Sequence, residues 1–185
     1  KLFLPSNMKF LKTSLKDCLL IEFLPHRDSR GSFARTFCVK GFREQGIEFQ
    51  VAQCNISVNQ DKGTLRGLHY QIAPCEEAKV VWCFSGRAYD VVVDLRAGSH
   101  TYKKWMAVEL SAEAGNALYI PKGFAHGFQT LLPDTQLFYW MSECYDETSA
   151  RGIRWNDPAF QIEWPDYQAI KISKRDETHP NFEDI

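Results

Sequence analysis

The stretch GTLRGLHYQ, residues 63–71, decides the fold together with GNALYIPKGFAH, residues 115–126. The second segment is typical of a strand that ends in a tight turn, because Pro121 and Gly123 set the backbone angles just before His126. In the first segment, strand alternation places His69 and Gln71 on one face of a sheet. The two segments therefore predict a β-sheet protein that carries histidines on its strands.

The rest of the chain supports this fold class. Aromatic residues make up 14% of 185 residues, and together with runs rich in Val and Ile they favour strands. Between residues 79 and 145 the strand-like runs are separated by Gly, Pro, Asp and Ser at short spacing. This pattern predicts an antiparallel sandwich or barrel. After residues 155–158 the chain is polar, and we expect loops and short helices packed on the barrel.

Length and charge narrow the possibilities further. A chain of 185 residues without repeats or linkers predicts a single domain over residues 1–185. Met8 is expected to be the initiator methionine of the natural chain, which would make residues 1–7 an addition to it. A formal net charge of −1 argues against nucleic-acid binding, and no apolar run approaches the roughly 20 residues of a membrane span.

The six cysteines predict a reducing environment. None forms a CxxC pair, and no signal-like apolar segment precedes them. Scattered reduced thiols are typical of a cytoplasmic protein.

The two quoted segments resemble the paired signature motifs of the cupin superfamily of small β-barrels. In a metal-binding cupin the matching positions hold histidines and a glutamate, whereas here they hold His69, Gln71, Lys79 and His126. An ammonium group is a poor ligand and brings positive charge to the place of the cation. We therefore expect no metal there, and a pocket suited to an anion or to a group that becomes anionic.

A more specific resemblance covers residues 17 to 180. The motifs RGLHYQ, VVVDLRAGS, VELSAE, YIPKGFAHGF, RGIRWNDPA and IEWP together resemble the RmlC-type nucleotide-sugar 3,5-epimerases, typified by dTDP-4-dehydrorhamnose 3,5-epimerase. This resemblance implies a cupin jelly roll with short C-terminal helices. It also implies an epimerase without metal or cofactor that acts on a nucleoside-diphosphate 4-keto sugar.

The chemistry of such a reaction needs a base, an acid across the sugar ring, and positive charge at the enolate oxygen. His69 is the natural base, because neutral imidazole accepts a proton near pH 7. The resemblance implies that Asp176 orients His69, that Tyr139 is the acid and that Lys79 stabilises the enolate oxygen. Tyr139 and Asp176 also have ordinary interpretations, as a packed aromatic residue and as part of a solvated charged run.

The resemblance also implies a set of residues that bind the substrate. Guanidinium groups bind phosphate oxygens in a bidentate manner, and polar side chains of one strand and an aromatic residue complete the set. The candidates are Arg30, Arg35, Gln53, Asn55, Arg66, His126, Tyr145 and Arg175.

Three positions depart from the family pattern. Arg35 stands where an acidic residue is frequent, Cys54 replaces an aspartate, and Cys144 falls where many members have an aromatic residue that stacks on thymine, with Tyr145 beside it. All three lie in the part of the pattern that binds substrate. We therefore hypothesise that the nucleotide or the sugar differs, with a CDP- or GDP-linked 4-keto sugar as a candidate.

Other functions remain open from the sequence. A related sugar-nucleotide 3,4-ketoisomerase and a cupin that binds a sugar nucleotide without turnover are the main alternatives. A metal-dependent cupin oxygenase is a third, which Lys79 and Gln71 disfavour. The resemblance further implies a homodimer, with an N-terminal strand that joins the neighbouring sheet and site residues that cross over. Which of C3 and C5 is inverted does not follow from the residues.

Overall fold

The structure is a computed structural model that describes residues 8–166 and 170–184. The expectation about residues 1–7 lies outside the described residues. The strands and helices follow one another in this order: β1 (Met8–Lys12), β2 (Leu19–Phe23), β3 (His26–Asp28), β4 (Gly31–Phe33), α1 (Val39–Glu44), β5 (Gln53–Asn59), β6 (Thr64–Gln71), β7 (Lys79–Ser85), β8 (Arg87–Asp94), β9 (Trp105–Ser111), β10 (Asn116–Ile120), β11 (Phe124–Thr130), β12 (Thr135–Met141), β13 (Ala150–Gly152), β14 (Lys171–Ile172), α2 (Lys174–Glu177) and the 3₁₀ turn η1 (Phe182–Asp184).

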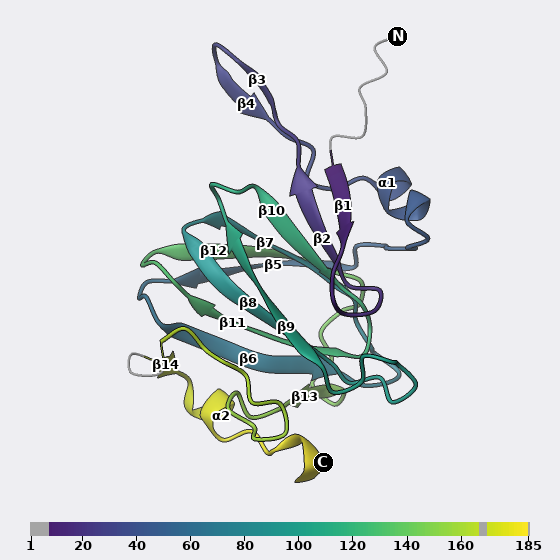
Figure 1. Cartoon of the computed structure of the whole chain (residues 1–185), viewed down its shortest axis with the longest axis vertical. Helices are drawn as coiled ribbons and strands as arrows, with labels where there is room; N and C mark the ends of the chain where they lie inside the picture. Colours follow the sequence, from purple (N-terminus) through teal and green to yellow (C-terminus); the bar gives the residue numbers. More distant parts are fainter. Residues whose placement is uncertain (1–7, 167–169, 185) are drawn as a thin grey trace.

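Two sheets form the body of the molecule (Figure 1). One has the strand order β1-β2-β10-β7-β12-β5, and the other has the order β13-β6-β11-β8-β9, with β14 added beside β6. The strand pairs are antiparallel except for the pair of β14 with β6. This arrangement confirms the predicted all-β jelly-roll sandwich.

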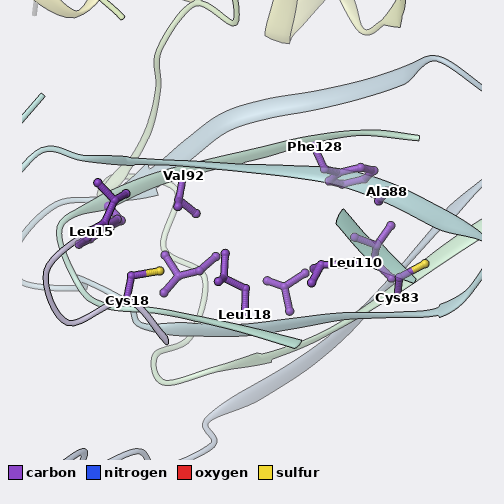
Figure 2. Close-up of a cluster of buried hydrophobic side chains, with 12 residues drawn as sticks. Leu15, Cys18, Cys83, Ala88, Val92, Leu110, Leu118 and Phe128 are labelled. Carbon is purple, nitrogen blue, oxygen red and sulfur yellow. The ribbon is translucent and has the colours of Figure 1, made fainter. Parts of the chain in front are cut away.

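The space between the sheets is filled by apolar side chains from both. Figure 2 shows this cluster, with Leu118 on one sheet and Val92 and Phe128 on the other. Each strand contributes every second residue to this layer, because successive side chains of a strand point to opposite faces. Phe128 also lines a cavity between the sheets, so the core continues into the wall of the candidate site.

The local elements follow the sequence with small shifts. The sequence GFREQG at residues 41–46 predicts a short helix or turn, and FQVAQCNISV at residues 49–58 predicts a strand. In the structure α1 begins earlier, at Val39, and β5 begins later, at Gln53. Phe49 is instead buried against Phe42 in a second apolar cluster. The sequence also predicts a turn from Asp28 to Gly31. This turn connects β3 and β4, and the hairpin extends away from the two sheets (Figure 1).

The C-terminal segment covers the outer face of β6. Figure 1 shows α2 beside this strand, and Lys171 of β14 pairs with Thr64 of β6. Short helices were expected in this tail, and α2 and η1 confirm them. None of the described helices is long and apolar enough to cross a membrane.

Candidate active site

A cavity of about 380 Å³ opens between the two sheets. Strands β5, β7 and β12 form one wall, and strands β6 and β11 of the other sheet form the opposite wall. The residues that line it are Asn55, Ile56, Ser57, Val58, Arg66, His69, Lys79, His126, Phe128, Tyr139 and Met141. Six of the twelve residues predicted from the sequence to act in catalysis or substrate binding are therefore at one cavity.

His69 and His126 lie side by side because β6 and β11 pair with these two residues in direct register. The strands approach closely beside them. A Cβ atom on Gly67 would lie 2.5 Å from the Cα of Gly127, and Gly67 has a φ of +126°. The glycines of the RGLH and AHGF motifs thus make room for the backbone that presents the two imidazoles.

Asp176 reaches His69 from the C-terminal segment. Ile172 of β14 pairs with β6, and Ser173 then caps α2 by accepting a hydrogen bond from the Asp176 amide. The carboxylate lies 2.8 Å from Nε2 of His69 through Oδ1, and its Oδ2 accepts a hydrogen bond from the amide of Gly67 at 3.2 Å. The structure brings together the pair that the resemblance implied.

The carboxylate of Asp176 is held in its charged form. Burial by itself would raise the pKa of Asp176, but the hydrogen bond with His69 and the amide of Gly67 outweigh burial and lower it. A charged carboxylate at Nε2 favours the tautomer in which Nε2–H donates to Asp176. The lone pair of His69 is then on Nδ1, where a base would accept a proton.

Tyr139 is on β12, in the sheet opposite His69. Its ring packs edge to face against His126, with ring centroids 6.1 Å apart. Burial of the phenol and the nearby carboxylate of Asp90 raise the pKa of Tyr139 well above its usual value, and Arg66 opposes this shift. The phenol therefore keeps its proton throughout the neutral range, as a proton donor must.

Lys79 is buried at the cavity and is paired. Its ammonium lies 2.9 Å from Oε1 of Glu77, with both side chains 7% exposed, and it donates to the carbonyl of His69 at 3.3 Å. An ammonium has three N–H donors, so one remains for a substrate oxygen. Glu77 was not singled out from the sequence, although its spacing of two from Lys79 could have indicated it.

His126 belongs to a second histidine–carboxylate pair. Its Nε2 lies 2.8 Å from Oδ2 of Asp90, and both side chains are buried. Oδ1 of Asp90 has no hydrogen-bond partner in the described part of the chain. Asp90 was not singled out from the sequence, although a charged residue inside the apolar run of β8 could have indicated it.

Polar side chains at the rim of the cavity form hydrogen bonds with neighbouring polar groups. Arg66 donates from Nε to Asn59 at 2.9 Å, which fixes the guanidinium at the cavity. Gln53 donates to Asn55 at 3.1 Å and accepts a hydrogen bond from the amide of Tyr145 at 3.1 Å. Gln53 thus positions two predicted binding residues without lining the cavity itself.

A smaller cavity of about 180 Å³ adjoins the first at His69. Its wall includes Tyr145, which is 55% exposed, and the guanidinium groups of Arg151 and Arg175. A hydrogen bond to Tyr145 raises the pKa of Arg175. An aromatic face beside two guanidinium groups suits a base and a diphosphate. Arg151 was not singled out as a site residue from the sequence, although it begins the RGIRWNDPA motif.

Two predicted binding residues lie away from the cavity of their own chain. Arg30 is at the tip of the β3–β4 hairpin, where its exposed guanidinium pairs with Asp28 at 2.7 Å. Arg35 is exposed in the segment after β4. Their proposed role at the substrate stays a prediction. Cys54, another departure from the family pattern, is exposed on β5 and does not line the cavity.

Comparisons with known proteins identify the family. The family model described as dTDP-4-dehydrorhamnose 3,5-epimerase matches residues 12–184. A dTDP-4-dehydrorhamnose 3,5-epimerase of Sinorhizobium fredii is 40% identical over 176 residues, which cover 95% of this chain and 90% of the relative. The crystal structure of the enzyme of the same name from Elizabethkingia anophelis superposes with a TM-score of 0.92 at 39% identity, covering 96% of this chain and 98% of that one.

A crystal structure of ChmJ, a 3'-monoepimerase from Streptomyces bikiniensis in complex with dTDP-quinovose, superposes with a TM-score of 0.85. It is 36% identical, over 91% of this chain and 85% of that one. Together with the match over residues 12–184, these similarities show that the chain belongs to the dTDP-4-dehydrorhamnose 3,5-epimerase family of isomerases.

Proposed function

We propose that this chain inverts one or both of the carbons beside the keto group of a nucleoside-diphosphate 4-keto sugar. The observation that carries the proposal is the His69–Asp176 pair on one sheet and the Tyr139 phenol on the other, at a shared cavity. A base and an acid on opposite walls suit a reaction in which a proton leaves one face of a ring and another arrives at the opposite face.

The residues supply each part of this reaction. Nδ1 of His69 accepts the proton next to the ketone, and the carboxylate of Asp176 stabilises the imidazolium that results. The electron pair of the broken C–H bond moves onto the keto oxygen, to which Lys79 donates its free N–H. Tyr139 then protonates the carbon from the other side. The proposed scheme uses neither metal nor organic cofactor.

The substrate class is supported by the smaller cavity. Arg151 and Arg175 provide charge for a diphosphate, and Tyr145 provides a surface on which a base can stack. Because Tyr145 supplies an aromatic face next to Cys144, that departure alone no longer argues for a different base. The relatives named above act on dTDP sugars by their names, and dTDP-4-keto sugars are the first substrates to test.

The test is incorporation of solvent deuterium into a panel of dTDP-, CDP- and GDP-linked 4-keto sugars, followed by NMR. We expect exchange and inversion at C3, C5 or both, and its loss in His69→Ala. His100→Ala, which changes an exposed histidine away from the cavity, is the matched control. Migration of the keto group would indicate a 3,4-ketoisomerase. Binding without exchange for every sugar would indicate a non-catalytic cupin and overturn the proposal.

We also propose that the protein acts as a homodimer in which Arg30 and Arg35 serve the partner's cavity. The β3–β4 hairpin carries Phe33, which is 75% exposed, and the edge strand β5 exposes Ile56 and Val58 beside the cavity. Exposed apolar groups of this kind mark interaction surfaces. A hairpin of one copy that covers β5 of the other would bury them and bring its guanidinium groups to the site.

Complementation tests the shared site. Arg30→Ala and His69→Ala are each expected to be inactive alone, whereas a mixed dimer contains one complete site if Arg30 acts across the interface. We therefore expect activity to return when the two variants are mixed and allowed to exchange subunits. If mixing restores none while native mass spectrometry shows mixed dimers, Arg30 acts within its own chain or not at all.

A further inference from the structure

A second imidazole lies against the His69–Asp176 pair. Nε2 of His179 is 3.5 Å from Oδ1 of Asp176, the same oxygen that lies 2.8 Å from Nε2 of His69. The His179 side chain is 13% exposed, and its Nε2 has no hydrogen-bond partner within the described ranges. Two imidazoles therefore direct the same ring nitrogen at one carboxylate oxygen.

The position of His179 is built into the fold. Its ring occupies the space above Gly152, where a Cβ atom would lie 2.2 Å from two of the ring atoms. Gly152 of β13 pairs with His69 of β6, so the glycine that admits the ring is directly beside the catalytic candidate. The carbonyl of Pro180 accepts a hydrogen bond from the amide of Arg154 at 2.9 Å and fixes the backbone that follows.

We propose that His69, Asp176 and His179 form a binding site for Zn²⁺, and that the bound ion inhibits the enzyme. The three ligand atoms lie within 4.8 Å of one another. Two imidazoles and one carboxylate are a donor set that Zn²⁺ takes, with water in the fourth position. Of the positions that match the metal ligands of a cupin this site uses only His69, whereas Asp176 and His179 come from the C-terminal segment.

Local charges permit such a cation. Asp176 supplies one negative charge, and the ammonium of Lys79 is neutralised by Glu77. The guanidinium of Arg175 is exposed and bonds to Tyr145, so water screens its charge.

Binding of Zn²⁺ to His69 changes the tautomer of the imidazole and so prevents this residue from acting as the base. An ion on Nε2 of His69 displaces the proton of the hydrogen bond to Asp176, and the neutral ring then carries its proton on Nδ1. Nδ1 can no longer accept the proton of the substrate. This inhibition rests on the proposed function, whereas binding of the ion does not.

Binding is measured first, by competition for Zn²⁺ with a chromophoric chelator. All proteins carry Cys54→Ser and Cys144→Ser, because these exposed thiols are competing ligands. We expect one site per chain, and His179→Gln to weaken it by at least about 10-fold, since even outer-shell partners of a metal contribute that much. His100→Gln is the matched control and should bind as tightly as the parent. Equal affinity in His179→Gln, or no saturable site, overturns the proposal.

Inhibition is measured second, as the ratio of deuterium exchange with and without Zn²⁺ for each protein. We expect Zn²⁺ to inhibit the parent and the His100→Gln control, and His179→Gln to resist. His179→Leu repeats the test with a side chain that has no polar atom, and thermal unfolding verifies that each variant is folded. Tight binding at His179 without any inhibition would contradict the inhibitory role while leaving the proposed epimerase activity untouched.

Discussion

Replacing Asp176 by Asn removes a charge while keeping the shape of the side chain. In the native protein the carboxylate lies 2.8 Å from Nε2 of His69 and is almost fully buried, at 8% exposure. The amide of Asn has no charge with which to stabilise the imidazolium, and it can turn its NH₂ group toward Nε2 and enforce the wrong tautomer. A hydrogen bond to a charged group contributes about 1.5–3 kcal/mol. Because each 1.36 kcal/mol is about tenfold in rate, kcat should fall by about 10- to 150-fold.

The assay for Asp176→Asn is the rate of deuterium exchange into a saturating sugar nucleotide. Glu177→Gln is the matched control, because Glu177 is on the same helix but exposed, and its carboxylate pairs with Lys174 at the surface. We expect the control to keep the full rate. An Asp176→Asn protein that is folded and exchanges as fast as the wild type would refute the claim that this carboxylate supports the base.

Three further outcomes concern stability and pH. Glu77→Gln leaves the buried ammonium of Lys79 unpaired, so the free energy of unfolding in urea should fall by about 3–5 kcal/mol; an unchanged midpoint would contradict the pairing. Burial would raise the pKa of Asp94, but hydrogen bonds led by Arg96 outweigh it and hold that pKa far below its usual value. Asp94 therefore stabilises the fold above about pH 4, the unfolded pKa, and this contribution is lost as pH falls toward the lowered pKa. Asp94→Asn should accordingly lower the melting temperature at pH 7 by more than at pH 2, and equal losses would contradict this. Burial raises the pKa of Tyr139, so the phenol should keep its proton at pH 10, the usual pKa of tyrosine. The pH–rate profile of the wild type should therefore show no decline near pH 10 that disappears in Tyr139→Phe.

Much of the fold follows from local chemistry in the sequence. Alternating apolar residues and the Gly, Pro and Asp turns predicted the strands from β7 to β12, because these signals lie within each hairpin. The segment at residues 49–52 was misassigned because Phe49 packs against Phe42 of α1. Whether residues 49–52 form a strand or a loop therefore depends on a contact with a residue outside the segment.

The candidate site was predicted in part, by residues inside motifs. His69, Lys79 and His126 lie in or near the two glycine-containing segments, and the structure brings them to one cavity. The residues that contact them lie far away in the sequence or in segments without a recognisable motif. Asp90 is 36 residues from His126, and His179 follows a short helix in a polar tail, so register between strands and packing of the tail had to be known first.

The arginine of the β3–β4 hairpin is a different case. Arg30 was predicted at the substrate, yet its guanidinium is exposed and bonded to Asp28. A sequence pattern can indicate that an arginine binds substrate. It does not indicate whether that arginine reaches the cavity of its own chain or that of a partner chain. The single-domain organisation of residues 1–185 likewise stays a prediction.

The central claim is that His69 and Tyr139 act on opposite faces of the sugar, and the stereochemical outcome in Tyr139→Phe tests it most directly. This variant keeps the base and its partner Asp176 but lacks the proton donor. The account predicts that the substrate still exchanges its α-proton with solvent deuterium, returned by His69 to the face it came from, while inversion is lost. Inversion at the wild-type rate in Tyr139→Phe, or loss of exchange together with inversion in a folded protein, would contradict the account.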